Sequence, residues 1–88
     1  MPYMISHFWP GGTEEQYRAN ISALHAAAGP QPELFHAAGP TDGGFLIVAT
    51  YESKEISDAF IQKTLMPLMP IEGGLVGPPE EHAAEIVS

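Results

Sequence analysis

The pattern of hydrophobic and polar positions divides the 88-residue chain into three short apolar runs, a fourth short segment of mixed polarity near the end, and two longer amphipathic segments. The short runs are typical of β-strands, because aromatic and β-branched residues are frequent in them and Gly, Pro or Asp residues bound them. The longer segments carry apolar residues three or four positions apart, which is typical of helices. The predicted strands, in chain order, are Tyr3–Trp9, Glu33–Ala38, Phe45–Tyr51 and Glu80–Val87.

The first helix is predicted between the first two strands, and the sequence marks both of its ends. Thr13 opens the sequence TEEQ, a capping box in which the threonine oxygen accepts from the Gln16 backbone and Gln16 reaches back. Gly29 and Pro30 end the helix, because glycine suits the position after a helix and proline cannot continue one. The apolar stripe between these ends consists of Tyr17, Ile21, Leu24 and Ala28.

The second helix is predicted after the third strand. Ser53 is a favourable N-cap for it, because a serine oxygen can accept from a free backbone N–H of the first turn. Pro67 lacks a backbone N–H, so we expect the helix to kink or end there. The apolar positions of this helix are Ile56, Ala59, Phe60 and Thr64.

The order of these elements is strand, helix, strand, strand, helix, strand. This is the split βαβ arrangement of ferredoxin-like domains. We therefore predict a single α+β domain over residues 1–88, with an antiparallel sheet and both helices on one of its faces.

The other face of this sheet also carries apolar residues. Side chains alternate between the two faces of a strand, and neither face of the central strands is clearly polar. On the first strand one face carries Tyr3, Ile5, His7 and Trp9, and the other carries Met4, Ser6 and Phe8. An apolar face of that size needs a cover, so we expect a homodimer in which a second copy packs sheet to sheet.

The net charge of the chain limits the classes of partner that it is expected to bind. Eleven acidic residues oppose three basic ones, which gives a formal net charge of −8. Nucleic acids and anionic membranes are bound by clusters of basic residues, so we expect neither as a partner. There is no signal-peptide pattern at the N-terminus, and no apolar run approaches the roughly 18 residues of a membrane span. We therefore expect a cytoplasmic protein.

The length, the order of elements and one stretch of sequence resemble a known group. The stretch contains HAAGPTDGGF and ends in YES, and its most specific parts are the hairpin Ala37–Gly44 and the junction Tyr51–Ser53, with Phe60 beyond. These features resemble the dimeric α/β-barrel superfamily, close to small bacterial proteins of the antibiotic-biosynthesis-monooxygenase type. The resemblance implies a ferredoxin-like protomer, a dimer with a barrel between two sheets, and a pocket between sheet and helices. Its members include cofactor-independent monooxygenases, haem-degrading enzymes, isomerases and polyketide cyclases, so it leaves the reaction open.

His36 is the first candidate catalytic residue, because it interrupts an apolar strand. The turn Gly39–Gly44 contains Asp42–Gly43, a strong hairpin signal. If Gly39 pairs with Gly44, His36 lies opposite Ile47 and on the same sheet face as Tyr51. A neutral imidazole on an apolar wall is suited to abstract a proton from a bound molecule. The alternative is a core histidine bonded to a backbone carbonyl or to Tyr51.

Other residues are predicted to share that face. His7 on the first strand and Tyr51 on the third are the further catalytic candidates, and we expect them to form one polar cluster with His36. The candidate substrate-binding residues are Trp9 as a stacking wall, Asn20 as a hydrogen-bond donor, and Ile47 and Phe60 as apolar contacts. We interpret Glu80 and Glu81 as a solvated pair.

We predict no metal site and no cofactor. The four histidines show none of the usual metal-ligand spacings. Haem binding stays open, because His36, His7 or His82 could supply an axial ligand although no motif marks one.

The leading hypothesis is a dimeric small-molecule-binding protein that acts by proton abstraction on an apolar aromatic or polyketide-like substrate. Its reaction would be that of a cofactor-independent monooxygenase, an isomerase or a cyclase. The alternative is a non-catalytic binding or structural dimer.

Overall fold

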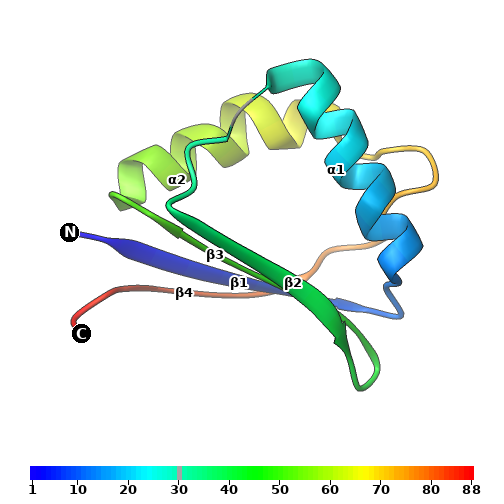
Figure 1. The fold of residues 1–88 in the computed structure, drawn as a ribbon, viewed down its shortest axis with the longest axis horizontal. Helices are drawn as coiled ribbons and strands as arrows, with labels where there is room; N and C mark the ends of the chain where they lie inside the picture. The colour runs from blue at the N-terminus through cyan, green and yellow to red at the C-terminus, as the bar shows by residue number, and fades with distance from the viewer. Residues whose placement is uncertain (30) are drawn as a thin grey trace.

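The computed structural model describes residues 1–29 and 31–88. Its strands form one antiparallel sheet in the order β2-β3-β1-β4, and both helices lie over the same side of that sheet (Figure 1). The elements, in chain order, are β1 (Tyr3–Pro10), α1 (Glu14–Ala28), β2 (Phe35–Thr41), β3 (Gly44–Tyr51), α2 (Lys54–Phe60) and β4 (Glu80–Glu85). This order confirms the ferredoxin-like α+β fold expected from the sequence.

The capping box of α1 forms as predicted. The Gln16 backbone N–H donates to Thr13 Oγ1 at 3.2 Å, and the Thr13 backbone N–H donates to Gln16 Oε1 at 3.0 Å. At the other end, Gly29 has a φ of 69° and its N–H donates to the His25 carbonyl oxygen. Only glycine adopts such a φ without steric cost. Pro30 lies outside the described residues, as does the side chain of Ala28.

Pro67 changes the geometry of the second helix, as expected. Ser53 Oγ accepts from the Ile56 backbone N–H at 3.3 Å and starts α2. After Phe60 the chain continues as a π-helix, η1 (Ile61–Leu65), and then as a 3₁₀ turn, η2 (Met66–Leu68). A proline lacks its N–H and clashes with the preceding turn, and Pro67 accordingly lies in the short, tighter 3₁₀ turn with which the helical segment ends.

The hairpin differs from its predicted register by two residues. Thr41, and not Gly39, pairs with Gly44, so the connection is the two-residue turn Asp42–Gly43. The strand continues through Pro40 because β2 is at the sheet edge, where a missing donor is tolerated. His36 therefore lies opposite Ala49 and not opposite Ile47. A shift of two keeps every side chain on its predicted face.

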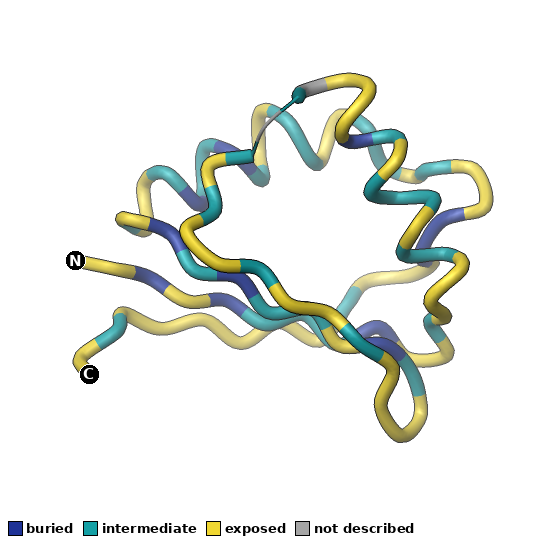
Figure 2. Tube along the Cα trace, viewed as in Figure 1, coloured by how far each residue is buried: buried dark blue, intermediate teal, exposed yellow. Residues whose placement is uncertain are grey.

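The core lies between the sheet and the helices. Figure 2 shows buried positions on the strands below the helices, whereas β4 is exposed throughout. We call the face toward the helices the inner face and the opposite one the outer face. Two buried clusters fill the core, one with Ile5, Leu24, Ala49, Tyr51 and Phe60, and the other with Trp9, Phe45 and Leu75.

The outer face carries exposed apolar side chains, and no helix among the described residues covers it (Figure 1). Met4, Phe35 and Leu46 lie on it with 44%, 58% and 37% of their surface exposed. Their positions alternate with buried inner-face residues, which is the pattern of a sheet with two apolar faces.

No helix within the described ranges has both the length and the apolar character needed to cross a membrane.

Candidate functional site

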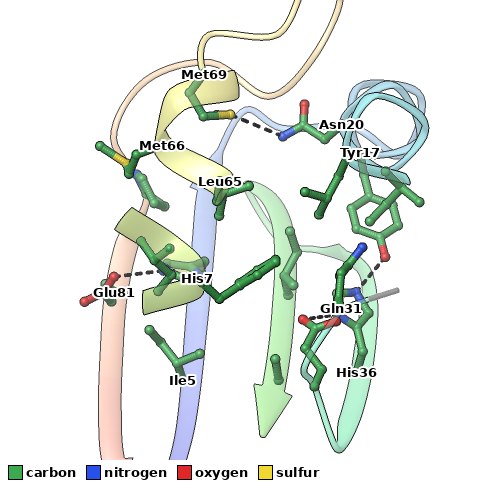
Figure 3. Close-up of a pocket in the computed structure, with 18 of the residues that line it drawn as sticks. Ile5, His7, Tyr17, Asn20, Gln31, His36, Leu65, Met66, Met69 and Glu81 are labelled. Atoms are coloured by element: carbon green, nitrogen blue, oxygen red, sulfur yellow. Dashed lines mark hydrogen bonds and ion pairs between the residues drawn. The ribbon is translucent and has the colours of Figure 1, made fainter. Parts of the chain in front are cut away.

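A cavity of ≈ 220 Å³ lies between the inner sheet face and the helices (Figure 3). Most of its lining is apolar and comes from β1, β3, α1 and the segment that runs from α2 into η2. The three candidate catalytic residues, His7, His36 and Tyr51, all line it. The four candidate binding residues line it as well: Trp9, Asn20, Ile47 and Phe60.

Four polar side chains form a continuous hydrogen-bonded group on one wall. His36 Nδ1 lies 2.9 Å from Glu33 Oε2, and His36 Nε2 lies 2.7 Å from the Tyr17 hydroxyl. The Tyr51 hydroxyl donates to the same Glu33 oxygen at 3.4 Å. We call Tyr17, Glu33, His36 and Tyr51 the His36 array.

The chemistry of Glu33 sets the direction of these hydrogen bonds. An ionised carboxylate only accepts, so His36 carries its hydrogen on Nδ1 and donates it to Glu33. In the neutral ring the Nε2 atom then carries the lone pair, and the Tyr17 hydroxyl donates to it. In this tautomer the basic nitrogen is oriented by a carboxylate on the other side of the ring, which is the arrangement of a histidine general base.

The two tyrosines of the array remain protonated at neutral pH. Burial raises the pKa of Tyr51 well above its ordinary value, and the charge of Glu33 and the hydrogen bond to it add to the rise. Burial also raises the pKa of Tyr17, as does Glu33, while Arg18 acts in the opposite direction. Both hydroxyls are therefore hydrogen-bond donors.

Glu33 reaches His36 because the strand begins later than predicted. In a strand that ran from Glu33, residues three apart would point to opposite faces. The strand starts at Phe35 instead, so Glu33 lies in the preceding segment and its carboxylate reaches the inner face. The hydrogen-bond partners of His36 thus come from α1 and from the chain ahead of β2.

His7 belongs to a separate group. Its Nε2 lies 2.9 Å from Glu81 Oε2, because His7 and Glu81 are paired neighbours on β1 and β4. Glu80 and Glu81 are both exposed, as expected of a solvated pair, but Glu81 also bonds to His7 and lines the cavity. The expected single cluster is therefore divided: His36 and Tyr51 share Glu33, whereas His7 bonds to Glu81.

Asn20 and Trp9 contribute mainly through packing. Asn20 Oδ1 accepts from the Leu75 backbone N–H at 3.0 Å and so fastens the loop before β4 to α1. A Cβ atom on Gly74 would collide with that oxygen, so any larger residue there would displace the asparagine side chain. Trp9 is buried against Phe45 and Leu75 and closes one part of the cavity wall.

Sequence reasoning missed three polar residues of the site. Tyr17 was interpreted only as part of the apolar helix stripe, Glu33 as the start of a strand, and Glu81 as solvated. The pairing of β1 with β4 could have indicated Glu81, because the two strands are neighbours in every ferredoxin-like sheet of this order. Nothing in the local sequence indicated Tyr17.

The described residues contain no group of three or more His, Asp or Glu side chains arranged to hold a metal ion.

Comparison with known proteins supports the fold. The chain matches no protein-family model and no curated protein. Among solved structures it is similar to a proposed antibiotic biosynthesis monooxygenase from Chloroflexus aurantiacus J-10-fl, with a TM-score of 0.67, 17% identity, and coverage of 100% of this chain and 95% of that one. It is similar to Rv0793 from Mycobacterium tuberculosis, with a TM-score of 0.67, 10% identity, and coverage of 100% and 97%.

A third similar structure is a proposed antibiotic biosynthesis monooxygenase from Deinococcus radiodurans, with a TM-score of 0.59, 12% identity, and coverage of 100% and 94%. The three similarities extend over the whole chain, so the resemblance noted in the sequence is confirmed for the fold. At these sequence identities the similarities support the fold and give no information about the residues of the site.

Proposed function

We propose that this chain binds a small apolar aromatic or polyketide-like molecule in its cavity and abstracts a proton from it with His36. The observation that carries the proposal is the His36 array: a carboxylate, an imidazole and a phenol joined in one line on the wall of an otherwise apolar cavity. An apolar pocket with a few convergent polar groups is the usual form of a small-molecule site.

In the proposed reaction, an acidic O–H or C–H of the substrate replaces the Tyr17 hydroxyl at His36 Nε2. The proton moves to Nε2, and the carboxylate of Glu33 stabilises the imidazolium that forms. The Tyr17 hydroxyl, released from His36, then donates to the enolate oxygen of the substrate. Exclusion of water by the apolar walls strengthens both interactions.

The following step is that of a cofactor-independent monooxygenase. The electron-rich enolate reacts with molecular oxygen, one oxygen atom remains on the substrate carbon as a carbonyl, and the other leaves as water. The substrate carbon supplies the electrons and the two hydrogens. Two of the similar structures belong to proteins described as proposed antibiotic biosynthesis monooxygenases, which supports this choice over an isomerase or a cyclase.

Tyr51 has a different role from the one expected. Its hydroxyl donates to Glu33, so we assign it the positioning of that carboxylate. The donor to the substrate oxygen becomes Tyr17, whose hydroxyl already lies at the reacting nitrogen of His36.

The proposal includes a second copy of the chain on the outer face. The exposed Met4, Phe35 and Leu46 support it, because a sheet face with this many apolar residues is unusual in a monomer. A two-fold axis would let one apolar sheet cover the other.

Oxygen consumption with an activated aromatic substrate tests the function. 2-Tetralone, with two fused rings, is a suitable probe, because deprotonation of its benzylic methylene yields an enolate and oxidation of that carbon yields a 1,2-dione that absorbs at longer wavelength. We expect the protein to accelerate oxygen uptake and His36→Asn to lower the rate about 10²- to 10⁴-fold. His25→Asn, an exposed histidine on α1, is the matched control and should keep the rate.

Binding measured on the same samples separates the two hypotheses. If the protein bound the aromatic probe without turnover, the hypothesis of a non-catalytic binding module would replace the hypothesis of an enzyme. Absence of both binding and turnover, across a panel of flat aromatic compounds, would contradict the proposed site itself.

A further inference from the structure

We propose that His7, oriented by Glu81, is a second hydrogen-bonding position at the opposite side of the cavity from His36. The cavity would then select a flat apolar molecule of one or two fused rings that carries a hydroxyl group at each end. This inference rests on the proposed function for the His36 end only.

The sheet register places the two histidines on one face but far apart. His7 on β1 pairs with Ile47 on β3, which pairs with Ala38 on β2, and His36 is two residues from Ala38. With strands about 4.8 Å apart and about 3.4 Å per residue, the two histidine Cα atoms are separated by about 12 Å. Figure 3 shows His7 with Glu81 on one side of the cavity and His36 on the other.

The surface between the histidines is apolar. Ile47 and Ala49 of the central strand β3 lie between them and also line the cavity. A molecule that reached both histidines would therefore rest its rings on aliphatic side chains and place polar atoms only at its two ends. This is an arrangement for a flat apolar body with two polar termini.

The hydrogen bond between His7 Nε2 and Glu81 leaves the other ring nitrogen, Nδ1, as an acceptor for a ligand. When the carboxylate accepts from Nε2–H at 2.9 Å, the lone pair of the neutral ring is on Nδ1. Among the described residues, no group donates a hydrogen bond to this Nδ1. An acceptor on an apolar wall recognises a hydroxyl hydrogen, whereas a ligand without a hydroxyl there would leave the acceptor unpaired.

The size of the cavity limits the ligand. Pockets for drug-sized molecules usually measure about 300–1,000 Å³, and this one measures ≈ 220 Å³. One or two fused rings suit that space better than the three or four rings of a larger polyketide.

The test compares 2,6-dihydroxynaphthalene with 2-naphthol by isothermal titration calorimetry. The symmetric diol can enter either way round, which alone gives a factor of about two. One further hydrogen bond adds about 5-fold, so we expect about 10-fold tighter binding of the diol by the wild-type protein. In His7→Phe the advantage should fall to about two-fold, and in the control His25→Phe it should remain about 10-fold.

Two further measurements keep the inference testable if His7→Phe folds poorly. In the wild-type protein, the ¹⁵N resonance of His7 Nδ1 should move when the diol is added and should stay in place with 2-naphthol. Glu81→Gln, at a half-exposed position, should reduce the advantage of the diol because the ring is no longer held in one tautomer.

The outcomes separate this inference from the proposed function. If the wild-type protein bound the diol no more than about two-fold tighter than 2-naphthol, the role of His7 would be overturned and that of His36 would stay intact. The same holds if the advantage of the diol survives in His7→Phe. Failure of both compounds to bind would overturn the two proposals together.

Discussion

Replacing Tyr17 by phenylalanine removes a single oxygen atom from the centre of the site. The Tyr17 hydroxyl donates to His36 Nε2 at 2.7 Å, while its ring stacks on Phe45 with centroids 5.0 Å apart. The phenylalanine keeps the ring contact, so the hydrogen bond alone is lost. Tyr3→Phe is the matched control, because Tyr3 is a buried tyrosine on the inner face that lies outside the His36 array.

The expected cost follows from what the substitution leaves behind. A buried acceptor without its donor costs about 1–3 kcal/mol. The Nε2 atom lines a cavity that water can enter, so Tyr17→Phe should lose about 1 kcal/mol, near the lower end of this range. For a domain of this size that lowers Tm by about 4–8 °C. Thermal and urea unfolding followed by circular dichroism measure it, and Tyr3→Phe should stay within about 0.5 kcal/mol of wild type.

The same variant tests the chemistry. If Tyr17 donates to the substrate oxygen, kcat for oxygen uptake should fall about 10²- to 10³-fold, because one oxyanion donor is removed. Binding of 2-naphthol should change little. A variant as stable as Tyr3→Phe and as active as the wild type would refute the reasoning, since the shortest hydrogen bond of the His36 array would then contribute to neither property.

Three further predictions concern the array, the outer face and the loop before β4. Because burial and Glu33 raise the pKa of Tyr51, its phenol should ionise at a higher pH than a tyrosine in the unfolded chain, and stability should fall as pH rises above about 10. Replacing the carboxylate by Glu33→Gln should shift the tyrosine titration, followed by ultraviolet absorbance, to lower pH. Leu46→Lys on the outer face should convert a dimer into folded monomers in light scattering, and a monomeric wild type would contradict the proposed second copy. Gly74→Ala should destabilise the protein by about 1–3 kcal/mol, because the new Cβ would meet an asparagine oxygen. Gly39→Ala should cost far less, because open space surrounds Gly39. Equal losses of stability in urea unfolding would count against this packing argument.

The elements could be predicted because their signals are local. The Thr13–Gln16 capping box, the Asp42–Gly43 turn and the break at Pro67 each act within a few residues, and all three occur in the structure. The strand faces could be predicted for a similar reason, because alternation along a strand needs no knowledge of its partners. The predicted register of β2 against β3 was wrong by two residues, since the register depends on where the turn closes.

The composition of the site was only partly predictable. All seven candidate residues line the cavity because a face assignment is enough to place them there. Their hydrogen-bond partners were missed, because Tyr17 and Glu33 reach His36 from other elements. Helix-to-strand packing and the true start of β2 at Phe35 decide those contacts, and neither leaves a pattern in the sequence.

By itself, then, the sequence determined the order of elements, the two apolar faces of the sheet and the face on which His7 and His36 lie. Those properties follow from periodicity and capping, which act between neighbours in the chain. Only the tertiary structure decided that His36 meets Glu33 and Tyr17 while His7 meets Glu81. Hydrogen bonds depend on distances of about 3 Å between side chains, and such distances between separate elements are set by packing and strand register.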